Sequence, residues 1–118
     1  MKKYEDLEVK VLEWAKDKGI LDKATPVAQA DKTLEEVNEL IEAIFWQSKD
    51  CQTYKNNKGT TCNTKEEIQD AFGDILVTII IGAKLQGLNL IECLESAYNV
   101  ISKRNGKMIN GKFEKDGK

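Results

Sequence analysis

Four stretches of the chain carry apolar residues at the spacing of an amphipathic α-helix. The first covers residues 4–18, and Gly19 after it is typical of a helix C-terminus. The second opens at Thr25-Pro26, which predicts an N-cap followed by proline at the first helical position, and it runs to about Ser48. Each element presents one apolar face to a core.

The third stretch begins at Thr64, where Thr64-Lys65-Glu66-Glu67 matches a capping box, and continues to Gly87. Residues 75–83 are apolar nearly all round. A helix of this kind needs neighbours on every side, so we expect a homodimer or homotetramer. The fourth helix has Asn89 as its N-cap and closes at Arg104-Asn105-Gly106.

The segments between these helices lose the periodicity. Residues 20–24 form a link, and residues 49–63 collect Asn, Thr, Lys and Gly, which predicts a surface loop. In the tail, Asn110-Gly111 favours a two-residue hairpin turn. No repeat or domain boundary interrupts the pattern. We therefore expect one all-α domain over residues 1–118, a four-helix bundle that is completed by oligomerisation. The Asn110-Gly111 turn favours a short hairpin in the C-terminal tail.

The amino-acid composition excludes several classes of function. A net charge of -2 gives no reason to expect a stable nucleic-acid partner, and the absence of histidine excludes His-based metal sites and Ser-His-Asp triads within the chain. No apolar run approaches the ~20 residues of a membrane span. We expect the three cysteines to be reduced thiols in a cytoplasmic protein: Cys51, Cys62 and Cys93. A disulfide between Cys51 and Cys62 across the loop is the alternative.

Polar residues gather on one side of two helices. In the second helix, Gln29, Lys32, Glu36 and Glu39 fall on a single stripe. The third helix carries an acidic stripe that includes Glu67. Mg²⁺ prefers oxygen ligands, and carboxylates three or four residues apart on a helix are close enough to share one ion. A solvated charged face is the alternative. The predicted metal ligands, for Mg²⁺ or alternatively Mn²⁺, are Glu36, Glu39, Asp70 and Asp74.

Three further features bear on this site. Gly73, beside Asp74 in mid-helix, costs ~1 kcal/mol relative to Ala and indicates a close helix approach at that level. Cationic and amide side chains gather near the end of the fourth helix and are candidates for binding phosphates. The alternative is that they only offset the helix dipole. They are Asn99, Lys103, Arg104 and Lys107. Three aromatic side chains are candidates for stacking on a nucleobase, with core packing the alternative: Trp14, Phe45 and Trp46.

These residues resemble a known family. KTLEEVNEL, followed later by DAFGDIL, looks like the ExxE and ExxD signature of the all-α nucleoside triphosphate pyrophosphohydrolases, in the MazG-like branch. The tail AYNVISKRNGKMINGKF is similar to the ending of short phage-type and bacterial MazG-like proteins. The resemblance implies a MazG-like helical bundle with Mg²⁺ between two helices, usually a dimer or dimer of dimers. It also implies hydrolysis of a (deoxy)nucleoside triphosphate to the monophosphate and pyrophosphate, a house-cleaning role.

By this resemblance, Glu36 and Glu39 match the ExxE pair and Asp74 matches the aspartate of ExxD. The chain departs from the pattern at Ala71, where the family has Glu, so Asp70 is the natural substitute. Second-line ligands are Glu67 and Glu35, and either Glu35 or Glu39 is the expected general base. The expected substrate contacts are Gln29, Lys32, Asn99, Lys103, Arg104 and Lys107.

Two other functions remain open. The apolar third helix and the missing glutamate suit a non-catalytic helical dimer that binds a nucleotide or a protein partner. A related pyrophosphohydrolase acting on a phosphoribosyl nucleotide is the other, although no residue argues for that substrate.

Overall fold

The structure, a computed structural model, describes residues 3–117. Within that range the chain forms five helices and two small antiparallel sheets, so the mostly helical fold is confirmed but not its description as four helices alone. The chain divides into two compact units, Met1–Gly87 and Leu88–Lys118, and each is described by itself.

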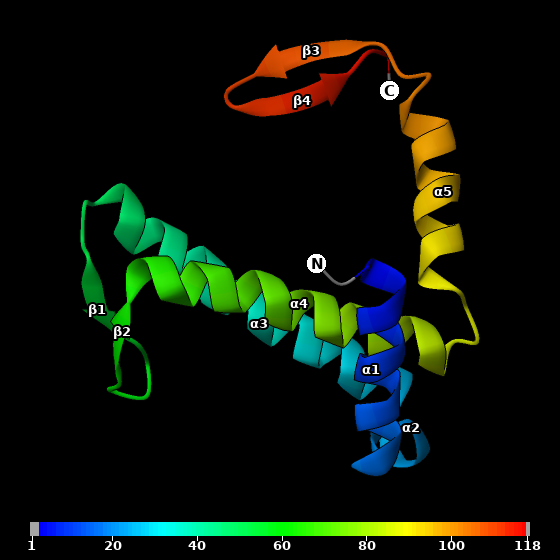
Figure 1. The fold of residues 1–118 in the computed structure, drawn as a ribbon. Helices are drawn as coiled ribbons and strands as arrows, with labels where there is room; N and C mark the ends of the chain where they lie inside the picture. Colours follow the sequence, from blue (N-terminus) through cyan, green and yellow to red (C-terminus); the bar gives the residue numbers. More distant parts are fainter. Residues whose placement is uncertain (1–2, 118) are drawn as a thin grey trace. The chain divides into compact units, whose positions relative to one another are not determined.

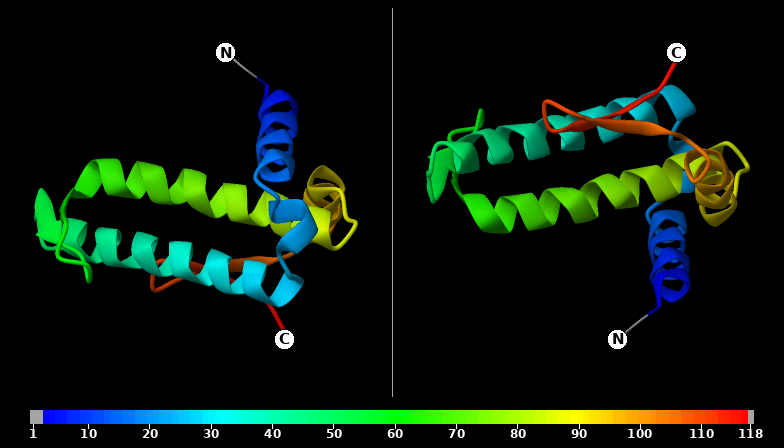
Figure 2. Two further views of the ribbon diagram at one scale, coloured as in Figure 1. Left: turned by 90° about the horizontal axis from the view of Figure 1, so that it is seen from below. Right: turned by 90° about the horizontal axis from the view of Figure 1, so that it is seen from above.

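A pair of long helices forms the first unit's framework. The helices α3 (Pro26–Ser48) and α4 (Thr64–Leu85) lie side by side and antiparallel (Figures 1 and 2). Two other helices, α1 (Tyr4–Asp17) and α2 (Ile20–Lys23), pack against α4. The bounds of α3 agree with the sequence, whereas α4 ends two residues before the expected Gly87 and α2 lies in the expected link.

Helix caps explain where the long helices begin. Thr25 caps α3 as expected, because its hydroxyl accepts a hydrogen bond from the Ala28 amide at 3.2 Å. The cap of α4 is Asn63, whose side-chain oxygen accepts from the Glu66 amide at 3.0 Å. The capping box assigned to Thr64 is therefore wrong. The Thr64 hydroxyl instead donates to the Cys51 carbonyl at 2.7 Å.

The connection between α3 and α4 is a β-hairpin rather than the expected loop. Strands β1 (Thr53–Lys55) and β2 (Thr61–Asn63) pair antiparallel, with Tyr54 opposite Cys62. Both side chains are buried against Ala43 of α3, and Trp46 and Ile68 pack around them. With three residues each, these strands are too short to show a period-2 pattern, and their burial depends on the helices beneath them. Cys51, Cys62 and Cys93 are free thiols.

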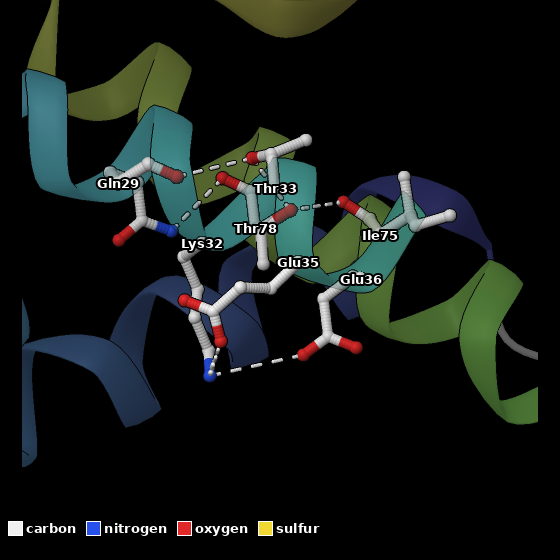
Figure 3. Close-up of polar contacts among 7 residues, drawn as sticks. All are labelled: Gln29, Lys32, Thr33, Glu35, Glu36, Ile75 and Thr78. Carbon is white, nitrogen blue, oxygen red and sulfur yellow. Dashed lines mark hydrogen bonds and ion pairs between the residues drawn. The ribbon is translucent and has the colours of Figure 1, made fainter. Parts of the chain in front are cut away.

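A buried polar contact joins α3 to α4 near the other end of the pair (Figure 3). The side-chain amide of Gln29 donates to the Thr78 carbonyl at 3.1 Å, and the Thr33 and Thr78 hydroxyls lie 2.9 Å apart. The Thr78 hydroxyl also donates to the Ile75 carbonyl at 2.7 Å. Two of these hydrogen bonds cross from α3 to α4, so they form only while the helices are paired, and they help to fix how the two helices align.

The close approach expected at Gly73 lies elsewhere. A Cβ added at Gly73 would meet nothing within 4 Å, whereas one at Gly82 would stand 3.7 Å from the Gln29 side chain. Gly73 therefore makes no room for a neighbouring helix in this unit.

The second unit contains one helix and one hairpin. Asn89 caps α5 (Leu90–Ile101) through a 3.0 Å hydrogen bond from the Glu92 amide, as expected, but the helix ends before residues 104–106. Strands β3 (Gly106–Ile109) and β4 (Lys112–Lys115) confirm the expected hairpin. Asn110 and Gly111 have φ values of 51° and 80°, as a type I′ turn requires.

The first unit buries few large side chains. Its buried apolar residues are mostly small or β-branched, and no large side chain among residues 3–117 is fully buried. On α3 and α4 the large apolar side chains that remain exposed are Val27, Leu34, Ile41, Ile44, Phe45, Phe72, Leu76 and Ile79. The apolar surface of α3 and α4 thus exceeds what this unit covers.

No single helix in the described part of the chain is long and apolar enough to cross a membrane; α4 and α5 reach that length and hydropathy only when taken together across their break.

The surroundings of Gly73 give a stability prediction. Gly73→Ala should raise the free energy of unfolding by about 0.5–1 kcal/mol, because alanine restricts the unfolded chain and its Cβ enters open space. Gly87→Ala is the matched control just beyond the same helix: its φ of 71° strains alanine, so it should destabilise by about 1 kcal/mol. Urea unfolding of both variants measures the difference. A destabilising Gly73→Ala would mean that the helix face at Gly73 is covered.

Candidate functional site

The candidate site lies on a face where carboxylates of α3 meet carboxylates of α4. On α3, the Glu36 side chain is 12% exposed, and the Lys32 ammonium stands 4.0 Å from its carboxylate and 3.6 Å from that of Glu35 (Figure 3). Both ion pairs lie within one helix, so Lys32 offsets only part of the charge gathered there.

Glu36 is affected by charges from both helices. Burial is the first cause that raises its pKa above the ordinary value of 4.5, followed by repulsion from Glu39 and Asp74, while Lys32 lowers it. Because Asp74 belongs to α4, its effect on Glu36 indicates that charges of the two helices come near each other at this point.

Glu67 is the corresponding residue on α4. Burial again comes first in raising its pKa, followed by repulsion from Asp70, Glu39, Asp74 and Glu42. The antiparallel pairing thus brings all four predicted ligands into one field of mutually repelling carboxylates. Glu67, which the sequence ranked only second as a ligand, belongs to this field of carboxylates.

This donor set suits a hard cation in chemistry but not yet in geometry. Its ligands are all carboxylate oxygens, which Mg²⁺ prefers, and a cation would relieve their repulsion. Within residues 3–117, however, no three acidic or cysteine side chains converge as a metal site would require. Chelation therefore requires rotation of these side chains, and the Mg²⁺ site stays a prediction.

A cleft of about 700 Å³ adjoins this acidic face. It lies along the second half of α3 and against the β1–β2 hairpin. Its lining combines carboxylates, aromatic rings, side-chain amides and a lysine: Glu35, Asn38, Glu39, Ile41, Glu42, Phe45, Trp46, Tyr54, Asn56, Asn57, Lys58 and Glu67. A ligand in this cleft can contact flat apolar groups and hydrogen-bonding groups within reach of the carboxylates.

The aromatic lining is ordered by ring packing. Trp46 and Tyr54 stack with ring centroids 6.2 Å apart and an interplanar angle of 18°. Phe45 meets Trp46 edge to face at 5.1 Å and 77°. Burial, with the nearby Cys62, Glu67 and Glu42, raises the pKa of Tyr54 to about 12, so its phenol stays protonated at neutral pH. Trp46 and Tyr54 therefore form a neutral, fixed wall.

The other predicted substrate residues lie in different settings. Gln29 is buried and bonded to α4, so its side chain has a packing role, and contact with substrate stays a prediction. Trp14, on α1, does not line the cleft among the residues described. The remaining group is exposed and lies in the second unit: Asn99, Lys103, Arg104 and Lys107.

The sequence interpretation ranked Glu67 only second, and it missed Glu42 and the hairpin residues Asn56 to Lys58. A signal for the acids was present, because Glu39-Leu40-Ile41-Glu42 and Glu67-Ile68-Gln69-Asp70 have the ExxE and ExxD spacing. Three residues before Asp74, the position that an ExxD motif would fill with glutamate is occupied by Ala71. Ala71 is buried on the core side of α4, where an unpaired carboxylate would be costly.

A comparison with models of known protein families found none that matches the chain, and a comparison with curated proteins found no match either.

The carboxylate field predicts a pH dependence of stability. A carboxyl group whose pKa is raised by folding contributes stability that is complete below its unfolded pKa and lost as pH rises through the folded pKa. In EDTA, Glu67→Gln should therefore stabilise the protein at about pH 7 and have little effect at about pH 4, where wild-type Glu67 is already protonated. Thermal unfolding across this range measures it.

Glu66→Gln is the matched control, since Glu66 is an exposed neighbour whose side chain does not line the cleft. Equal shifts in melting temperature for the two variants at every pH would contradict the carboxylate field around Glu67.

Proposed function

We propose that this protein is a Mg²⁺-dependent, MazG-like pyrophosphohydrolase that converts a (deoxy)nucleoside triphosphate to its monophosphate and pyrophosphate. The observation that carries the proposal is the pairing of α3 with α4, which sets carboxylates of two helices in one repelling cluster beside a mixed aromatic and amide cleft. A divalent cation relieves such repulsion, and a triphosphate is a ligand that needs that cation.

The residues proposed to hold the metal are the four ligands expected from the sequence together with Glu67. When bound, Mg²⁺ supplies charge neutralisation for the phosphoryl oxygens and the leaving pyrophosphate. The chain's own contribution is positioning. The buried Gln29–Thr78 contact and the hairpin core fix the two helices at their opposite ends, so the carboxylates between them are held at a set separation.

Proton transfer is assigned to Glu35 or Glu39. Both carboxylates line the cleft, and both belong to α3 near the proposed ligands. Glu35 is 63% exposed and stands 3.6 Å from the Lys32 ammonium, so water reaches it and Lys32 keeps it oriented. A carboxylate in this position can accept a proton from an attacking water. Lys32 is proposed to contact phosphates.

A second copy of the chain is proposed to complete the bundle. Large apolar side chains such as Leu34, Ile41 and Phe72 are more than half exposed on α3 and α4. Monomeric soluble proteins rarely leave contiguous apolar patches of this kind uncovered. We propose self-association because the half of α4 that is apolar on all sides needs more neighbouring helices than this unit provides.

Turnover tests the function. Purified protein with Mg²⁺ should release pyrophosphate from one or more nucleoside triphosphates in a panel of natural and modified substrates. Asp74→Asn and Glu67→Gln should each lower kcat by about 100-fold or more, because each removes a charge that holds the cation. Glu66→Gln should retain wild-type kcat. Circular dichroism checks that helix content is unchanged.

The non-catalytic alternative has a distinct outcome in the same experiment. Tight nucleotide binding that is unaffected by EDTA, with no pyrophosphate released from any substrate, would contradict the enzyme and favour a binding protein.

Sedimentation tests the assembly. The protein should sediment as a species larger than its 13.3 kDa monomer at micromolar concentration. Leu76→Glu, which places a charge at a partly exposed apolar position of α4, should shift the mass toward the monomer. A stable monomer in the wild type would contradict the proposed second copy.

A further inference from the structure

We infer that the cleft between α3 and the β1–β2 hairpin is a nucleobase-binding subsite, with Phe45 stacking on the base and Asn57 reading its edge. The inference rests on the proposed function for its substrate class, a nucleotide. The subsite is the part of the site that would distinguish one base from another. We assign this recognition to the hairpin that connects α3 to α4.

The charges of the cleft favour a neutral occupant. Four glutamates line it, and among the described residues Lys58 is the cation that lines it with them. A bare triphosphate would be repelled from such walls, whereas a base carries no net charge and offers donors and acceptors. The neutral end of a nucleotide therefore belongs at the aromatic part of the cleft, with the phosphates toward the metal-binding carboxylates.

Phe45 is the ring available for stacking. It lines the cleft and is 49% exposed, whereas Tyr54 is buried and Trp46 is partly buried and stacked on Tyr54. The edge-to-face contact with Trp46 restricts the orientation of the Phe45 ring. The Lys49 ammonium lies over one face of the Phe45 ring, 5.6 Å from its centroid, so a stacking base takes the opposite face.

The hairpin tip supplies the hydrogen-bonding edge. The Asn56 side-chain oxygen accepts from the Lys58 and Thr60 amides at 3.0 Å each, and its amide nitrogen lies 3.6 Å from the Cys62 sulfur. Asn56 is thus engaged in closing the loop and acts as a positioning residue. Its neighbour Asn57 is exposed and lines the cleft. An amide both donates and accepts, so Asn57 can pair with a base edge.

Steady-state kinetics over the nucleoside triphosphate panel tests the subsite. Phe45→Ala should raise KM for the preferred substrate by about 10-fold or more while kcat changes by less than about 3-fold, because a lost base stack removes binding shared by ground state and transition state. Phe45→Leu, which keeps apolar bulk without the π face, should raise KM similarly, and Phe45→Trp should restore it. Asn57→Ala should reduce the preference between best and worst base by about 10-fold.

Phe113→Ala is the matched control, an exposed phenylalanine of β4 that does not line the cleft, and it should leave KM and base preference unchanged. Wild-type KM and wild-type base preference in both Phe45→Ala and Asn57→Ala would overturn the subsite while leaving the proposed hydrolase in place.

A second measurement separates the two proposals. Millimolar nucleosides without phosphates are titrated in EDTA and binding is followed by tryptophan fluorescence, since Trp46 lies beside Phe45. Nucleoside binding that is weakened by Phe45→Ala but not by Phe113→Ala supports the subsite even if no triphosphate is hydrolysed. Equal binding by wild type and Phe45→Ala would overturn it, whatever the turnover result.

Discussion

The antiparallel contact between α3 and α4 is the constraint on which the first unit depends. It is held at one end by the buried hydrogen bond from Gln29 to the Thr78 carbonyl and at the other by the small core of Ala43, Tyr54 and Cys62. Between these ends it forces like charges together, and burial and repulsion raise the pKa of Glu36 and Glu67. Packing energy is thus used to oppose electrostatic repulsion, an arrangement that is common at functional sites.

The hairpin gives the helix pair a side wall. Tyr54 and Cys62 anchor it by burial, Asn56 shapes its tip, and the Thr64 hydroxyl ties the start of α4 to the Cys51 carbonyl. A flexible loop of the same length would leave the acidic face flat and open to water. The rigid hairpin instead creates a cleft with distinct apolar, amide and charged regions, and such a cleft can orient a ligand with chemically different ends.

The exposed apolar residues of α3 and α4 have a related origin. A two-helix framework has too little volume to enclose large side chains, so its buried positions are occupied by residues such as Ala43 and Ala71. The larger side chains remain at the surface. The stability of this unit therefore depends on what covers that surface.

The sequence by itself determined the features that depend on neighbouring residues. Thr25-Pro26 and Asn89 set helix starts, Asn110-Gly111 set a turn, and helical spacing placed the acids on one side of each helix, because caps, turns and periodicity are local. Tertiary structure decided the rest. In the folded chain Asn63 rather than Thr64 is the cap of α4, and part of residues 49–63 forms strands. The close approach to a neighbouring side chain occurs at Gly82 rather than Gly73, and Glu67 belongs to the acidic cluster. Each of these depends on which distant segment lies alongside, and a one-dimensional pattern does not contain that distance.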